Sequence, residues 1–126
     1  MKQVKPAAHR LLEIILALAI ASSFGTFANA EASADRFLQI YDQANPKDKL
    51  IFGKVLGSAQ NGMAWSNEAL QQEHGFRLFC APEHMAFVDQ QVVAIMREFV
   101  KNHPERQGAP YGMVLLLALK EAFPCK

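Results

Sequence analysis

The sequence has few cysteines, almost no net charge and none of the short motifs that mark common enzyme families. Its 126 residues include two cysteines and one tryptophan, and the formal net charge is +1. It lacks a glycine-rich phosphate loop, a nucleophile elbow and a metalloprotease histidine pair. The near-neutral charge gives no electrostatic footprint for nucleic acid. We therefore expect neither an enzyme nor a nucleic-acid-binding protein.

The first thirty residues have the pattern of a cleavable export signal. Three basic side chains within the first ten residues precede an apolar stretch over 11–21, and a small-x-small cleavage site stands at 28–30. A membrane-spanning helix needs roughly 20 apolar residues, so a retained anchor is the weaker alternative. The pattern predicts export, removal of residues 1–30, a single domain over 31–126 and no stable membrane insertion after cleavage.

The predicted mature domain is too small for its core alone to hold it firmly. It has 96 residues, and removing three basic and one acidic side chain with the leader leaves ten basic and eleven acidic ones. A domain of this size buries only about two-thirds of its unfolded surface. Small exported domains commonly compensate with disulfides or by forming oligomers.

Cys80 and Cys125 are the two cysteines, and an oxidising compartment leaves them one intramolecular pairing. Closing this loop stabilises the fold by about 4 kcal/mol in the loop-closure model. The alternative is a nucleophilic Cys80 assisted by His84, which export disfavours because exported thiols are oxidised. The sequence predicts a Cys80–Cys125 disulfide.

Apolar side chains recur at helical spacing through most of the mature sequence, which predicts an all-α bundle of about four helices. Asn45 is a good N-cap and Pro46 a good first residue for the second helix. Residues 66–82 are the least periodic, and they predict a short irregular helix and a polar loop. The expected helices run over about 33–44, 46–65, 87–102 and 110–123.

Two surfaces predict close packing, one that glycines leave without side chains and one that is apolar. Gly53 and Gly57 leave one face of the second helix bare, at a cost of about 1 kcal/mol each relative to alanine. We expect another backbone to cross there, within the chain or across a dimer, and simple tolerance of both glycines is the alternative. The run 113–119 is apolar on every side, which predicts burial all round. Part of that surface is a candidate subunit interface.

The histidines and acidic residues form no convincing reactive site. No Asp or Glu stands where it would complete a metal site with His74 and His84, so solvent-facing loop histidines are expected and no metal or cofactor. Glu68 and Glu73 are five residues apart and share no face, which argues against an acid/base pair. Trp65 is expected in the core, with an interface anchor as the alternative.

The C-terminal half carries an ordered set of short motifs. They are Phe79-Cys80-x-Pro82, Gln91-Val92-Val93, His103-Pro104-Glu105, Ala118-Leu119 and Ala122-Phe123-Pro124-Cys125. This set, in this order and spacing, resembles the Rap/Tai immunity proteins, which protect bacteria from type VI secretion amidase effectors. A segment with two glycines, Phe52-Gly53-x-x-x-Gly57, also looks like the second helix of that family.

This resemblance implies a small all-helical periplasmic protein, often a homodimer, with a disulfide between Cys80 and Cys125. In the family, characterised members bind a peptidoglycan-cleaving amidase and block its active site. The chain departs from the family pattern at Tyr41, near which many members carry a further cysteine. It also departs at Tyr111, where a small residue is expected.

The expected function is therefore binding and occlusion of an amidase effector by a rigid scaffold. A disulfide-stapled stress chaperone that exposes apolar surface at low pH is the alternative. The polar segment after Trp65 and the turn near His103 are the candidates to contact the partner. The candidate residues are Trp65, Glu68, Glu73, His74, Arg77, His103, Glu105 and Arg106.

Overall fold

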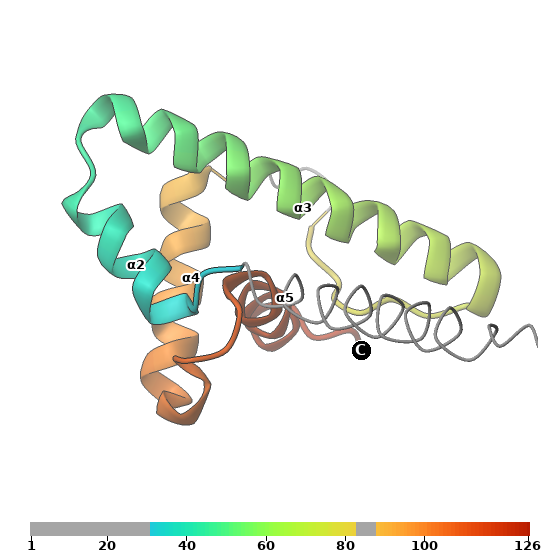
Figure 1. The fold of residues 1–126 in the computed structure, drawn as a ribbon. Helices are drawn as coiled ribbons and strands as arrows, with labels where there is room; N and C mark the ends of the chain where they lie inside the picture. Colours follow the sequence, from blue (N-terminus) through green and yellow to red (C-terminus); the bar gives the residue numbers. More distant parts are fainter. Residues whose placement is uncertain (1–30, 83–87) are drawn as a thin grey trace, which may run out of the picture. The chain divides into compact units, whose positions relative to one another are not determined.

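A computed structural model describes residues 31–82 and 88–126, and the secondary structure of these residues is almost entirely helical (Figure 1). The export signal predicted over 1–30 and the histidine His84 lie outside the described residues. The prediction of an all-α bundle of about four helices is confirmed. The elements are α2 (Ala34–Gln43), α3 (Pro46–His74), α4 (Asp89–Asn102), the 3-10 helix η2 (Pro104–Arg106) and α5 (Tyr111–Ala122).

The connection between α2 and α3 forms as the sequence predicts. Asn45 is the N-cap of α3, and its side-chain Oδ1 accepts a hydrogen bond from the backbone N–H of Asp48 at 2.9 Å. Pro46 is the first helical residue, where its missing N–H costs nothing. The carboxylate of Asp48 complements the positive end of the helix dipole.

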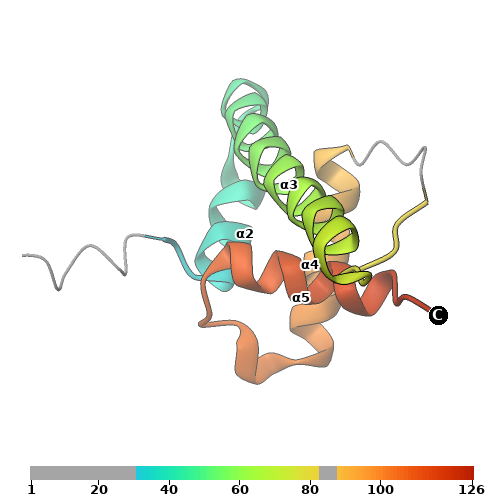
Figure 2. The ribbon, with the colours of Figure 1, turned by 90° about the vertical axis from the view of Figure 1, so that its right-hand side faces the viewer.

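The core is centred on the crossing of α4 and α5 and is covered by α2 and by the first half of α3 (Figures 1 and 2). Its largest fully buried side chains are Leu56 of α3, Val92 and Met96 of α4, and Val114, Leu115 and Leu119 of α5. Backbone hydrogen bonds join the start of α2 to the start of α5, from Ala34 N to Ala109 O at 2.9 Å and from Tyr111 N to Ala32 O at 3.0 Å.

The second predicted helix is much longer in the structure than in the sequence analysis. The expected end near Trp65 is wrong, because α3 continues to His74 and ends at Gly75 in the left-handed conformation, with φ of 74°. Residues 66–74 are polar but rich in Glu, Gln, Ala and Leu, which favour helix whatever their polarity. The lack of an apolar stripe over residues 66–74 therefore indicated that this part of the helix is exposed to solvent, and not that the helix had ended.

The run 113–119 in α5 is buried on one side and not all round. Val114, Leu115 and Ala118 are buried, whereas 47% of the surface of Met113 is exposed. The domain has too few elements to surround a whole helix. Within 31–82 and 88–126, no helix combines the length and apolar character needed to cross a membrane.

Candidate functional site

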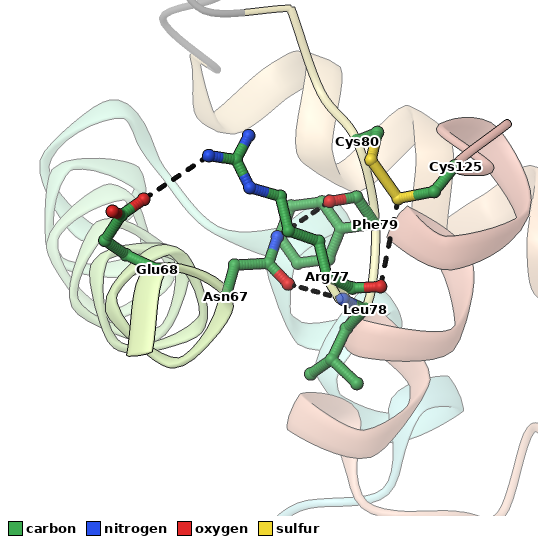
Figure 3. Close-up of a disulfide and its surroundings, with 7 residues drawn as sticks. All are labelled: Asn67, Glu68, Arg77, Leu78, Phe79, Cys80 and Cys125. Atoms are coloured by element: carbon green, nitrogen blue, oxygen red, sulfur yellow. Dashed lines mark hydrogen bonds and ion pairs between the residues drawn. A yellow bond between two sulfur atoms is a disulfide. The ribbon is translucent and has the colours of Figure 1, made fainter. Parts of the chain in front are cut away.

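The C-terminal end of α3 is held by a buried asparagine that binds the chain as it returns along the helix (Figure 3). Asn67 is 8% exposed, and its side chain makes two hydrogen bonds to the returning backbone. Its Nδ2 donates to the carbonyl oxygen of Phe79 at 2.8 Å, and its Oδ1 accepts from the N–H of Leu78 at 2.7 Å. One amide thus satisfies a donor and an acceptor that would otherwise be buried without partners.

The disulfide predicted between Cys80 and Cys125 is confirmed, with a Cα–Cα distance of 5.0 Å. Beside it, the N–H of Cys80 donates to the carbonyl oxygen of Phe123 at 2.8 Å. The returning segment, residues 77–81, is therefore fastened to α3 by Asn67 and to the end of α5 by the disulfide (Figure 3). Together these links connect the far end of α3 to the bundle.

An ion pair lies across the open side of this segment. Arg77 Nη2 is 3.4 Å from Glu68 Oε2, and Gln72 Nε2 donates to Glu68 Oε1 at 2.9 Å. The two charged side chains stand at the edge of a small pocket of about 170 Å³, whose lining includes Phe79 and Ala81. The pocket has both apolar and hydrogen-bonding groups at its walls, which suits contact with a protein side chain.

Trp65 is strongly exposed, so its expected place in the core is wrong. Its exposed fraction is 79%, whereas Leu56 on the same helix is fully buried. Nine residues at 100° each place the two on opposite sides of α3. Glu68 follows one turn later on the same side as Trp65. An exposed tryptophan beside charged groups on a helix is the arrangement that protein interfaces use as an anchor.

The remaining candidates at this end of α3 are also exposed. The side chains of His74 and Glu73 are 58% and 70% exposed, with 3.8 Å between His74 Nε2 and Glu73 Oε2. The ring of His74 stacks on Phe76 at a centroid distance of 6.2 Å. His74 is at a helix end and not in the predicted loop. We define the distal α3 surface as Trp65, Glu68, Glu73, His74, Phe76 and Arg77.

Phe76 was missed by the sequence analysis. It is 51% exposed and follows Gly75 directly. The signal that would have found it is the glycine itself, because an αL glycine after a run of helix formers marks a helix end. Here the Phe76 ring stays half-exposed and stacks on that of His74.

The other three predicted contact residues form a separate cluster where α4 passes into η2. His103 Nε2 lies 2.6 Å from Glu121 Oε2 of α5, and His103 Nδ1 lies 3.7 Å from Glu105 Oε1. The Phe99 ring packs against the imidazole at 4.5 Å, and Arg106 Nε is 4.0 Å from Glu105. Figure 1 shows the end of α3 and the turn after α4 well apart. His103 is therefore a cross-link between helices, not a free loop histidine.

Gly53 and Gly57, the two α3 glycines at which the sequence predicts a close crossing, differ in their surroundings. A Cβ added at Gly53 would lie 3.4 Å from the Asp89 carboxylate, whereas one at Gly57 would meet no described atom within 4 Å. No backbone of the described residues therefore crosses closely at Gly57. A crossing at this glycine between two copies stays a prediction.

A second electrostatic feature joins α2 to α4. Arg97 donates to both carboxylate oxygens of Asp42, with Nη1 to Oδ2 at 2.9 Å. These hydrogen bonds lower the pKa of Asp42 and raise that of Arg97. Burial and the nearby Asp89 carboxylate raise the pKa of the Tyr41 hydroxyl. In the described residues, no group of three or more His, Cys, Asp or Glu side chains is placed to hold a metal ion.

Comparison with known proteins assigns this chain to a family. The chain has no significant match among curated proteins, and none among solved structures. A family model described as Rap1a immunity proteins matches residues 29–125. This range covers most of the chain, including the disulfide and all eight predicted contact residues. The resemblance to immunity proteins is thus confirmed, and the chain belongs to the Rap1a immunity protein family.

Proposed function

We propose that the protein is a periplasmic immunity protein of a type VI secretion system that binds a peptidoglycan amidase effector and occludes its active site. Membership of an immunity family implies a protein partner and favours this function over the stress-chaperone alternative. The single observation that carries the location of the contact is the 79% exposure of Trp65 on the outer side of α3. The proposed role is binding, so it requires no catalytic residue.

The construction of the distal α3 surface supports occlusion. An inhibitor that blocks an active site needs a protrusion that keeps its shape when it enters the cleft, because ordering a flexible loop costs affinity. Here the protrusion is a continuous helix whose end is fastened by Asn67 and by the Cys80–Cys125 disulfide. The segment that presents Trp65 is therefore ordered before binding.

The chemical composition of this surface also supports a protein partner. Tryptophan and arginine are enriched at the energetic centres of protein interfaces. Trp65 supplies the large apolar contact, while Glu68 and Arg77 supply charges of both signs nearby. A stable complex of this kind buries about 1,600 Å² in total. That area requires neighbouring turns of α3 to contribute as well.

The proposed location has independent support from the disulfide. A disulfide is retained in oxidising compartments such as the periplasm and is rare in the bacterial cytosol. The export signal predicted over 1–30 would deliver the chain there. We also propose that the mature protein is a homodimer, which the resemblance implies and which small exported domains use to gain stability.

The proposal is tested by co-purifying the mature protein with its partner from the periplasm, identifying whether that partner is an amidase, and measuring the affinity by calorimetry. Trp65→Ala is expected to weaken binding by about 30-fold or more, as loss of an interface anchor does. Met113→Ala is the matched control, because it also shortens an exposed apolar side chain but on α5.

The outcomes separate the function from its location. Two results together would contradict the proposed function. No cell-wall hydrolase would be recovered with the protein, and cells that express the protein would still be killed by an amidase directed to the periplasm. Tight binding by Trp65→Ala and Met113→Ala alike would place the contact elsewhere on the molecule. Inhibition of amidase activity in vitro in proportion to bound protein is the expected direct result.

A further inference from the structure

A hollow of about 510 Å³ lies between the middle of α3 and the first residue of α5, and it is open to solvent. Its lining includes the side chains of Val55 and Ala59 of α3 and of Tyr111 at the start of α5, so its walls are mostly apolar. We call it the α3–α5 pocket. An apolar hollow with polar groups at its edge is a feature of protein interaction sites.

The apolar walls of the α3–α5 pocket are fixed by the core. The Tyr111 ring stacks on Phe37 of α2, with 4.6 Å between the ring centroids and 16° between the ring planes. The backbone N–H of Tyr111 donates to the carbonyl oxygen of Ala32 at 3.0 Å. Ala59 and Tyr111 both pack against the buried core residues. The pocket is therefore formed in advance, and filling it requires little ordering of this chain.

Two exposed polar residues, Lys54 and Ser58, complete the lining of the pocket. The Ser58 hydroxyl donates to the carbonyl oxygen of Lys54 at 2.9 Å. Among the described residues, the Lys54 ammonium group takes part in no ion pair, whereas the Arg77 guanidinium is paired with Glu68. Lys54 thus places a positive charge without a neutralising carboxylate beside the apolar walls.

The α3–α5 pocket and Trp65 lie on the same side of α3. Trp65 follows Ser58 by seven residues, which at 100° per residue leaves the two only about 20° apart around the helix. Along the helix axis they are about 10 Å apart. Gly62 lies between them, and a Cβ added there would meet no described atom within 4 Å. The surface between them is open at Gly62, so a partner that contacts Trp65 can extend to the pocket.

We propose that the α3–α5 pocket is a second contact for the effector and takes an apolar side chain that stands next to a carboxylate. The apolar side chain fills the space against Val55 and Tyr111, and the carboxylate pairs with the Lys54 ammonium group. An interface of standard size uses about 20–30 residues on each side, more than the distal α3 surface has. The contact therefore extends past Trp65, and the pocket lies in its path. This inference deepens the function proposed above and rests on it.

The first test measures, by calorimetry, the affinity of Lys54→Glu for the partner co-purified from the periplasm. Reversing the charge is expected to weaken binding by about tenfold or more at low salt and by less at high salt, because the pair is partly exposed. Lys49→Glu is the matched control and should bind as wild type does. It makes the same change of charge on the same helix, about 140° around the axis from Lys54.

The carboxylate of the partner is identified by a charge swap. Acidic residues of the partner are replaced by lysine one at a time, and each product is titrated with Lys54→Glu. One of these replacements is expected to restore binding to within about threefold of the wild-type pair, because it forms the ion pair in the reverse direction. If none restores binding, Lys54 does not pair with a carboxylate of the partner, and that part of the proposal is overturned.

The second variant, Ser58→Trp, tests the pocket without changing the charge of Lys54. A large side chain at this exposed position fills the hollow and is expected to weaken binding by about tenfold or more. Thermal denaturation of Ser58→Trp and Lys54→Glu checks that both variants fold. Wild-type affinity of both variants would overturn this inference and leave the proposed function intact. A changed oligomeric state of Ser58→Trp with unchanged affinity for the partner would assign the pocket to a second copy, which also overturns it.

The identity of the partner separates this inference from the proposed function. A partner that binds through Lys54 and Ser58 but is not an amidase would contradict the proposed function and support the pocket as a protein contact. An amidase that binds both variants as tightly as wild type would do the reverse. Recovery of no protein partner would overturn both.

Discussion

The two halves of α3 are held in place by different means. The first half buries Leu56 fully and packs Phe52, Ala59 and Met63 against the common core. In the second half, after Met63, the buried side chain is Asn67, a polar residue. The same helix is therefore part of the hydrophobic bundle at one end and a braced projection at the other.

The difference shows how a small domain can extend a rigid element beyond its core. Hydrophobic burial scales with the number of surrounding elements, and a domain of this size has few. Beyond the core, hydrogen bonds and a covalent bond replace apolar contacts. These hold specific atoms of Asn67, Leu78 and Phe79 while leaving the outer side of the helix, with Trp65, exposed.

Loss of the disulfide should have the largest effect on stability and should distinguish the two halves of α3 most clearly. Replacing Cys80 and Cys125 together by alanine is expected to lower the free energy of unfolding by about 4 kcal/mol, the loop-closure value for a separation of 45 residues. Urea denaturation measures the loss. In hydrogen exchange, amides of 67–81 should lose more protection than those of α4. Uniform loss over both regions would contradict the idea of a separately braced projection.

A core truncation should produce the opposite pattern. Leu115 is fully buried in α5, and Leu115→Ala is expected to cost about 3 kcal/mol through lost burial and the cavity that remains. The loss should appear at the level of global unfolding and spare the affinity for the proposed amidase partner, because Trp65 and its supports are unchanged. Met113→Ala, at an exposed position of the same helix, should cost less than about 0.5 kcal/mol.

Removing the two hydrogen bonds by which Asn67 braces the returning segment should have an intermediate and local effect on stability. Asn67→Ala leaves the N–H of Leu78 and the carbonyl of Phe79 without their partners, at a cost of about 2 kcal/mol. Exchange of the Leu78 amide should rise more than that of amides in α5. Asn61→Ala is the control, since Asn61 is an exposed amide on the same helix. Equal effects of the two substitutions on stability would show that Asn67 is not a brace.

The sequence was sufficient to predict the helices wherever burial is periodic. The apolar spacing in α4 and the Asn45-Pro46 start of α3 predict elements that the structure confirms. The disulfide was predicted from two cysteines in a chain whose sequence indicates export, and the structure confirms it. The part of α3 beyond Trp65 could not be found from apolar periodicity, because this segment projects from the core and has little apolar surface to bury.

The candidate site was less predictable because it depends on long-range partners. Asn67 looks like an ordinary polar residue, and its role appears only when Leu78 and Phe79 return along α3, 11 and 12 residues later. His103 likewise lies 18 residues from Glu121, the carboxylate it binds. Trp65 was assigned to the core by its chemistry, but the position of Leu56 on the helix places it outside.

The smallest expected effect concerns the ion pair of the bundle half, which lies on the surface. Hydrogen bonds from Arg97 hold the pKa of Asp42 below its usual range, so the folded state binds this proton more weakly than the unfolded chain. The pair therefore stabilises the fold above the ordinary aspartate pKa of about 3.9, and this contribution is lost as the pH falls through the lower folded value. Both side chains are about half exposed, which limits the contribution to about 0.5 kcal/mol.

Asp42→Asn should accordingly lower stability slightly at pH 7 and by progressively less as the pH falls below the ordinary aspartate pKa, as measured by urea denaturation over this range. Arg97→Gln should produce the same loss, and the double variant little more, because each substitution already removes the pair. High salt should reduce the difference at pH 7, since both charges are exposed to solvent. A loss of several kcal/mol would mean that charge, and not the α4–α5 core, holds this half together.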